Sequence, residues 1–363
     1  MCFMVSCPYV PPHEFAIDIP SLFIRYKAIE DKKDSKFLDN QLAKTDRNGK
    51  IGLVFSKFLN FLLTKDRKIF RNFFSIFTGI DASATLPRFN NLSFKAFFKK
   101  YRKKFQHKKN YNEKVIIFSS CYVNYNDSKI GESLVKVLEK NKVYMEEFYP
   151  GCCKMPQLEQ GKVDEVKQMA IKTSKMLIDK IEKGFKVIAP VASCALMLKS
   201  HWPLLNSDNE NVKKLAKATM DVDEYIWDLN NRVGLAEGMK ALKNNITLHS
   251  SCHSRAQNIG PKSAQILRLI PGTKSVSIEK CSGHGGTWGI KKKWNKTARK
   301  VGLAAAKQVF KEDNSLIAST CPLAGLHLQD INESKKINKT VDKIYHPIEL
   351  IAKSYGFQES VSE

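Results

Sequence analysis

The chain contains the same pattern twice: short apolar segments, typical of buried strands, that each end in cysteine. The first set spans residues 114–121, 142–153 and 185–194, and the second spans residues 244–252, 273–281 and 314–321. The offsets between paired cysteines are 131 residues (Cys121 to Cys252), 129 residues (Cys152 to Cys281) and 127 residues (Cys194 to Cys321). Because these offsets stay within four residues of one another, the pattern indicates an internal repeat.

Segments with helical periodicity lie between the strand candidates, such as residues 131–140 and 163–184. Alternating strands and helices predict mostly parallel sheets, whose ligands bind beyond the carboxyl ends of the strands. The expected fold is therefore α/β, with two repeated Rossmann-like units preceded by a mainly helical, basic N-terminal region. The repeat places three cysteine positions of each unit at one edge of its sheet.

Five regions are expected along the chain. They are residues 1–110 (a remnant of a ferredoxin-like segment and basic helices), 111–205 (first cysteine-rich unit), 206–243 (linker and helix), 244–330 (second unit) and 331–363 (C-terminal helix). In the first region, apolar residues at helical spacing predict helix within residues 56–77 and 90–110, with Ser93 as an N-cap.

The first unit offers four thiols, from Cys121, Cys152, Cys153 and Cys194. A cysteine group without histidine favours an iron–sulfur cluster or zinc. Adjacent side chains point apart, so Cys152 and Cys153 suit different irons of one cluster better than a single zinc ion. The alternative is that these are buried core cysteines, since unpaired cysteine is often buried.

The second unit offers three thiols, from Cys252, Cys281 and Cys321, and Ser282 stands where the first unit has Cys153. His253 and His284 lie close in sequence to these cysteines and could complete a metal site or exchange protons with a sulfur substrate. Cys2 and Cys7 precede the units, and Cys7 is followed by proline, as at the end of a bacterial ferredoxin motif. Two cysteines cannot hold a cubane cluster, so that site is truncated, completed by another chain, or a relic.

With these residues placed, the chain resembles a known family. It is similar to the C subunit of anaerobic glycerol-3-phosphate dehydrogenase and to heterodisulfide reductase B-type subunits, which share a tandem cysteine-rich CCG domain. The family motif is a lone cysteine, then CCG, then C-x-x-C, and it occurs twice. The matching residues here are Cys121, Cys152-Cys153-Lys154 and Val191-x-x-Cys194, and then Cys252, Cys281-Ser282-Gly283 and Ala318-x-x-Cys321. Each C-x-x-C lacks its first cysteine.

The resemblance implies an iron–sulfur subunit, with [4Fe–4S] as the expected cluster, that passes electrons from a flavin dehydrogenase or other redox subunit towards quinone. Two alternatives remain: a heterodisulfide or thiol–disulfide reductase that acts at a cluster, and a zinc-binding assembly module without redox activity. No flavin or nicotinamide site is evident in the sequence.

Charge and cysteine usage bear on location and partners. The net charge of +24 comes largely from lysine; it is either a compositional habit or suited to an acidic partner or an anionic membrane. Nucleic acid is not expected as a partner. The nine cysteines, without an evident export signal, favour a reducing cytoplasm. Peripheral contact with the inner face of the cell membrane is an open alternative.

Overall fold

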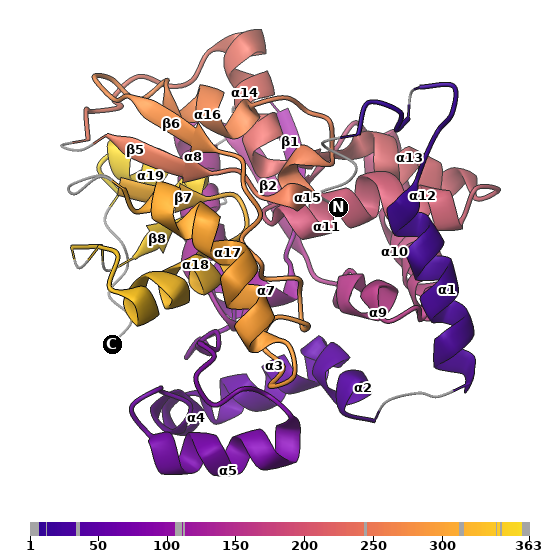
Figure 1. Ribbon diagram of the computed structural model, residues 1–363. Coiled ribbons are helices and arrows are strands. Elements are labelled where there is room, and N and C mark those ends of the chain that lie inside the picture. The colour runs from indigo at the N-terminus through magenta and orange to yellow at the C-terminus, as the bar shows by residue number, and fades with distance from the viewer. Residues whose placement is uncertain are drawn as a thin grey trace.

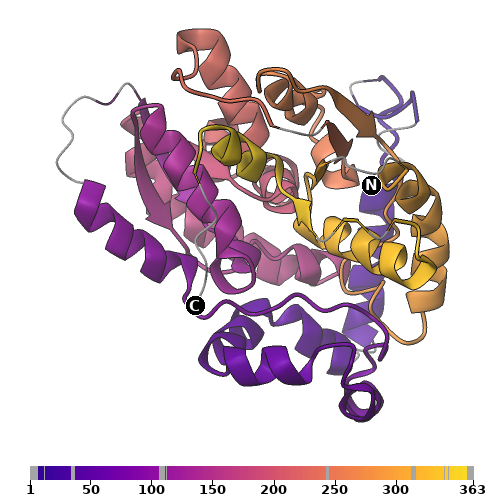
Figure 2. The ribbon, with the colours of Figure 1, turned by 90° about the vertical axis from the view of Figure 1, so that its left-hand side faces the viewer.

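The structure is a computed structural model. It describes residues 7–11, 13–33, 37–105, 111, 113–242, 245–311, 316–338, 340–341 and 343–357. Two α/β halves lie side by side, and helices of the N-terminal region lie along one edge of both (Figure 1). The same arrangement is visible after a quarter turn (Figure 2).

The first half is built on a four-stranded sheet in the order β2-β1-β3-β4, and all its strands are parallel. The strands are β1 (Glu113–Phe118), β2 (Val143–Phe148), β3 (Lys186–Ala189) and β4 (Thr219–Asp221). The helices of this part are α7 (Cys121–Tyr125), α8 (Ser128–Lys140), α9 (Met155–Glu159), α10 (Val163–Glu182), α11 (Ala192–Leu196), the π-helix η2 (Met197–His201), α12 (Trp202–Leu205), α13 (Glu210–Ala218) and α14 (Val222–Val233).

The second half repeats this topology in the order β6-β5-β7-β8, again with all strands parallel. Its strands are β5 (Ile246–His249), β6 (Ser275–Ile278), β7 (Leu316–Ser319) and β8 (Ile344–Tyr345). Its helices are α15 (Cys252–Arg255), α16 (Lys262–Leu267), α17 (Asn295–Val309), α18 (Pro322–Lys335) and α19 (Pro347–Ser354). The identical strand order confirms the predicted α/β fold with two repeated units.

Two short edge strands were not anticipated. β4 has three residues and β8 has two, too few to produce a recognisable alternation in sequence. They carry the first sheet to residue 221 and the second to residue 345, beyond residues 205 and 330, where the two cysteine-rich units were expected to end.

The N-terminal region is helical, as predicted. Its helices are α1 (Ile19–Lys33), α2 (Phe37–Ala43), α3 (Thr45–Val54), α4 (Ser56–Leu62), α5 (Lys68–Thr78) and α6 (Phe94–Phe105). The Ser93 hydroxyl accepts a hydrogen bond from the Ala96 N–H at 3.2 Å, which confirms it as the N-cap. Helix is interrupted between α4 and α5, where the Thr64 hydroxyl donates to the Phe61 carbonyl at 3.0 Å and so competes with the helical backbone.

The two halves share one hydrophobic core. A single cluster of buried side chains includes Val115 and Ile188 from the first sheet and Leu248 from the second, together with Ile351 of α19. The N-terminal region contacts both halves, because Gln157 donates to the Ala43 carbonyl at 2.8 Å and the Asp81 N–H donates to the Ile290 carbonyl at 2.8 Å. Among the helices of the described residues, none is long and apolar enough to span a bilayer.

Candidate metal centre

The structure brings the four first-half thiols together at the carboxyl ends of β1, β2 and β3. The Cys121 Sγ lies 3.8 Å from the Cys152 Sγ, and the Cys194 Sγ lies 3.4 Å from the Cys153 Sγ. Cys152, Cys153 and Cys194 are buried, and Cys121 is half-buried at the start of α7. Parallel topology thus gathers residues that are up to 73 positions apart in sequence at one sheet edge.

The turn after β2 has the same geometry as the turn after β6. The Lys154 N–H donates to the Cys152 Sγ at 3.4 Å, and the Gly283 N–H donates to the Cys281 Sγ at 3.4 Å. Lys154 has φ 70° and Gly283 has φ 75°, so both occupy the left-handed region that glycine adopts most easily. Positions 152–154 and 281–283 are therefore structural equivalents.

Helix α3 packs its first turn against the thiol group. Asp46 Oδ2 accepts the Cys152 N–H at 2.9 Å, and its other oxygen accepts the Tyr149 hydroxyl. The Thr45 hydroxyl is buried without a conventional hydrogen-bond partner among the described residues. It lies close to the thiols of Cys121 and Cys152, where it contributes to the lowered pKa of Cys152 and partly offsets the raised pKa of Cys121. Sequence patterns gave no signal for Thr45 or Asp46, because they meet the thiols only through tertiary packing.

Hydrogen bonds among the thiols shift their pKa values in opposite directions. The pKa of Cys152 is lowered well below its ordinary value, because its sulfur accepts hydrogen bonds from the thiols of Cys121 and Cys153. The pKa of Cys121 and that of Cys153 are raised, chiefly because each thiol donates to Cys152. The group therefore concentrates negative charge on the Cys152 sulfur, which also faces the Lys154 N–H.

The donor set suits a cluster of several metal atoms. A tetrahedral zinc site with Zn–S bonds of about 2.3 Å places all its sulfurs in mutual contact. The two close sulfur pairs meet that spacing, but within the described ranges no three His, Cys, Asp or Glu side chains form a group that could hold one ion. A four-iron cluster binds each thiolate to a different iron, so it does not need that convergence. The four thiols and the Thr45 hydroxyl without a partner are compatible with such a group.

The second half spreads its three thiols differently. Cys252 begins α15, Cys281 is exposed after β6, and Cys321 is buried at the N-terminus of α18. Burial raises the pKa of the Cys321 thiol, and Ser193 and Cys194 of the first half lie close enough to affect that pKa as well. Ser282, the equivalent of Cys153, is buried, and its hydroxyl accepts the His284 N–H at 3.4 Å.

One of the two predicted histidines contacts the first half, and the other lies beside a further histidine of the second half. His253 Nδ1 lies 2.8 Å from the Ser193 Oγ of α11. His284 is half-buried, and desolvation lowers its pKa to about 3; among the described residues its Nε2 has no hydrogen-bond partner. Sequence reasoning missed His327 of α18, whose ring centroid lies 6.1 Å from that of His284 and whose Nε2 also lacks a partner.

The remaining predicted ligands are Cys2 and Cys7. Cys7 is half-buried in the irregular segment before α1, and Cys2 lies outside the described residues.

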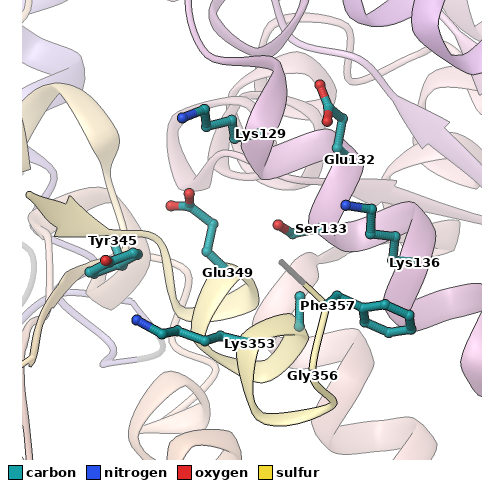
Figure 3. Close-up of a pocket in the computed structure, with 10 residues that line it drawn as sticks. Lys129, Glu132, Ser133, Lys136, Tyr345, Glu349, Lys353, Gly356 and Phe357 are labelled. Atoms are coloured by element: carbon teal, nitrogen blue, oxygen red, sulfur yellow. The ribbon is translucent and has the colours of Figure 1, made fainter. Parts of the chain in front are cut away.

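Trp202 was not predicted, yet its indole N–H donates to the Cys153 carbonyl at 3.2 Å and so fixes the backbone of the cysteine pair. A separate cavity of 420 Å³ lies between α8 and α19 and is lined by residues such as Lys136 and Lys353 (Figure 3). It contains none of the predicted ligands.

Comparison with known proteins places these features in a family. The model of the cysteine-rich CCG domain matches residues 115–199 and 246–329. Lactate utilization protein A of Macrococcus caseolyticus is 30% identical over 188 residues, which cover 49% of this chain and 73% of that protein. The chain belongs to the family of proteins with two cysteine-rich CCG domains.

Two further relatives of the CCG family are named as parts of oxidoreductases. The C subunit of anaerobic glycerol-3-phosphate dehydrogenase from Escherichia coli K12 is 25% identical over 342 residues, covering 93% of this chain and 82% of that protein. The B subunit of the CoM/CoB fumarate reductase from Methanothermobacter marburgensis is 25% identical over 255 residues. That match covers 68% of this chain but only 47% of the relative, so the chain spans about half of that protein's length.

Proposed function

We propose that this chain is an iron–sulfur electron-transfer subunit of an oxidoreductase complex. Cys121, Cys152, Cys153 and Cys194 would hold a [4Fe–4S] cluster, which when bound accepts and donates single electrons. The observation that supports this most is the gathering of four mostly buried thiols from three strand ends at one edge of the sheet. The names of the CCG relatives, which include one component of a dehydrogenase and one of a reductase, support the same class of function.

The residues around the thiols could stabilise the negative charge of a bound cluster. The Lys154 N–H and the Thr45 hydroxyl lie beside the Cys152 sulfur, and hydrogen bonds to thiolates are a main determinant of cluster potential. Asp46 holds the backbone of the cysteine pair through the Cys152 N–H. Burial of three of the four thiols limits access of water and oxidants.

The finer proposal is that electrons come from a flavin dehydrogenase of the glycerol-3-phosphate dehydrogenase type and leave towards membrane quinone. Helices α4 and α5 lie at the edge of the molecule (Figure 1), and with the end of α3 they expose many large apolar side chains. Ile69 is 89% exposed and Val54 is 75% exposed, and Lys57 and Lys68 accompany them on α4 and α5. Exposed aliphatic and aromatic residues accompanied by lysine are typical of helices that lie in an anionic membrane surface.

Membrane contact is tested by flotation of the full chain with vesicles that contain phosphatidylglycerol. The Phe73→Glu variant places a charge on the exposed face of α5 and is expected to abolish flotation. Ile171→Glu is the matched control, because Ile171 is exposed on α10, away from this face. Equal flotation of both variants would contradict the assignment of this face, and absence of flotation in the wild type would contradict membrane contact by the isolated chain.

One observation favours a second candidate, direct reduction of a disulfide substrate. A cavity of 260 Å³ is lined by Thr45, Asp46 and Lys154, each of which lies next to the thiol group. A small molecule bound there would be close to the sulfurs, as a thiol–disulfide reductase requires.

Electron transfer is tested on protein purified without oxygen and reduced by dithionite. Rapid oxidation by the soluble quinone menadione, without turnover of added disulfides, is the result expected of an electron carrier. Steady disulfide turnover by the isolated chain would favour the second candidate. Failure of menadione to oxidise the reduced chain would contradict the quinone proposal.

Metal binding by the second half and by the N-terminal cysteines stays a prediction. Cys252, Cys281 and Cys321, with His253 and His284, are the candidate ligands of a further metal group, either iron or zinc. Cys321 lies near Cys194 of the first half, and we propose that it serves the first-half group as well. Cys2 and Cys7 would need ligands from another chain or segment.

A further inference from the structure

A basic cavity lies where helix α5 meets α17 and α18 of the second half. Its volume is 470 Å³, and its lining includes Lys65, Lys68 and Arg71 from the N-terminal region and Arg299, Asp330 and Glu333 from the second half. None of these residues belongs to the candidate metal centre. The cavity is large enough for a phosphate group with a small organic substituent.

Arg71 is the fixed element of this cavity. The residue is only 1% exposed, although an arginine is rarely buried without partners for its charge. The guanidinium Nε donates to the Ala82 carbonyl at 3.1 Å, and Nη2 donates to the carbonyls of Asp81 and Ala84 at 3.0 and 2.7 Å. The remaining nitrogen, Nη1, is buried and has no hydrogen-bond partner among the residues that the structure describes. Leaving such a donor unsatisfied costs about 1–3 kcal/mol or more, so an absent acceptor would explain it.

The charges around Arg71 leave a surplus of cations. Lys65 pairs with both Asp330 and Glu333, and Arg299 Nη2 lies 2.7 Å from the Asp330 carboxylate. These contacts occupy the two carboxylates of the lining. In the part of the chain that the structure describes, no salt bridge involves Lys68 or Arg71. The lining therefore carries four cations against two anions, and a phosphate group of charge near −2 would match the difference.

We infer that this cavity is a phosphate-binding site, with Arg71 and Lys68 as its principal donors. The phosphate belongs either to a lipid headgroup or to a soluble phosphate ester. The lipid source rests on the proposed membrane contact, because the exposed residues Ile69 and Phe73 of the same helix border the residues that line the cavity. The soluble source does not depend on it.

The test is titration of the full chain with inorganic phosphate by calorimetry, and flotation with phosphatidylcholine vesicles with and without phosphatidylglycerol. Lys68→Glu reverses the charge of an exposed lining residue with little risk to folding, and Arg71→Lys keeps a charge but loses the fork of donors. Lys300→Glu is the matched control, since it makes the same charge change on α17 outside the lining. Loss of one charged hydrogen bond predicts phosphate binding at least about tenfold weaker in Lys68→Glu, with Lys300→Glu close to the wild type.

The outcomes separate the two sources. Phosphate binding that depends on Lys68, without an effect on flotation, assigns the site to a soluble ester. Flotation that needs phosphatidylglycerol and is lost in Lys68→Glu but kept in Lys300→Glu assigns it to a lipid headgroup. If neither phosphate nor vesicle binding distinguishes Lys68→Glu from Lys300→Glu, the inference is wrong. Iron content, measured on the same samples, reports on the proposed cluster separately.

Discussion

Substitution of residue 154 tests whether the two cysteine turns, residues 152–154 and 281–283, are structural equivalents. Lys154 adopts φ 70° where the second half has Gly283 at φ 75°. The left-handed conformation costs a non-glycine residue about 1–2 kcal/mol, whereas glycine raises the entropy of the unfolded chain by about 0.4–1 kcal/mol. The ion pair of Lys154 with Glu165 is 3.5 Å long and half-exposed, so it contributes little. Lys154→Gly should therefore stabilise the fold by about 0.5–1 kcal/mol.

The reverse change should be strongly destabilising. A Cβ at Gly283 would lie 2.1 Å from the Ala298 carbonyl oxygen and 2.8 Å from the Gly302 nitrogen. Conformational strain and this overlap together predict a loss of about 3 kcal/mol or more for Gly283→Ala. Gly184→Ala is the control without steric overlap, because Gly184 has φ 85° and a Cβ there meets nothing within 4 Å; it should cost about 0.5–1 kcal/mol.

Urea unfolding of the full chain under reducing conditions and at equal metal content measures all three variants. The expected order of stability is Lys154→Gly, then wild type, then Gly184→Ala, then Gly283→Ala. A destabilising Lys154→Gly together with a neutral Gly283→Ala would refute the proposed equivalence of the two turns.

Three further predictions follow from single contacts. Trp202→Phe leaves the Cys153 carbonyl without its donor and should cost about 2–4 kcal/mol in urea unfolding; an unchanged midpoint would contradict that role. Asp46→Asn weakens the acceptor of the Cys152 N–H and should lower iron retention during anaerobic dialysis, whereas Asp66→Asn, on the loop between α4 and α5, should not. Burial lowers the pKa of His346 to about 3, so the unfolded chain binds the extra proton; stability should fall by up to about 1.4 kcal/mol per pH unit from pH 6.5 towards 3. His346→Asn, which keeps a capping side chain, should flatten that slope.

The repeat was predictable because strand ends in a parallel α/β sheet share one edge. The cysteines that close residues 114–121, 142–153 and 185–194 therefore had to lie near one another once the alternation of strands and helices was recognised. Their close pairing, Cys121 with Cys152 and Cys153 with Cys194, is a matter of side-chain packing that spacing does not determine. The edge strands β4 and β8 escaped prediction because they are too short to carry a pattern.

Contacts between distant segments could not be predicted from spacing. Thr45 and Asp46 reach the thiols from a helix 106 residues before Cys152, and nothing local distinguishes them from surface residues. The approach of Cys321 to Cys194 depends on how the two halves pack together. Arg71 sits in a basic amphipathic segment whose sequence suggests a solvated residue, and only the fold buries it beneath three carbonyls.

The central claim is that the first-half thiols hold an iron–sulfur cluster. Its most direct measurement is iron, acid-labile sulfide and reduced-state EPR of anaerobically purified full chain, compared between Cys152→Ser and its structural counterpart Cys281→Ser. We expect about four irons and four sulfides per first-half site with an EPR signal of a reduced [4Fe–4S] cluster. That signal should be lost in Cys152→Ser and retained in Cys281→Ser. Colourless, zinc-loaded protein without an EPR signal, or an iron content and EPR signal that are the same in Cys152→Ser as in the wild type, would contradict the account.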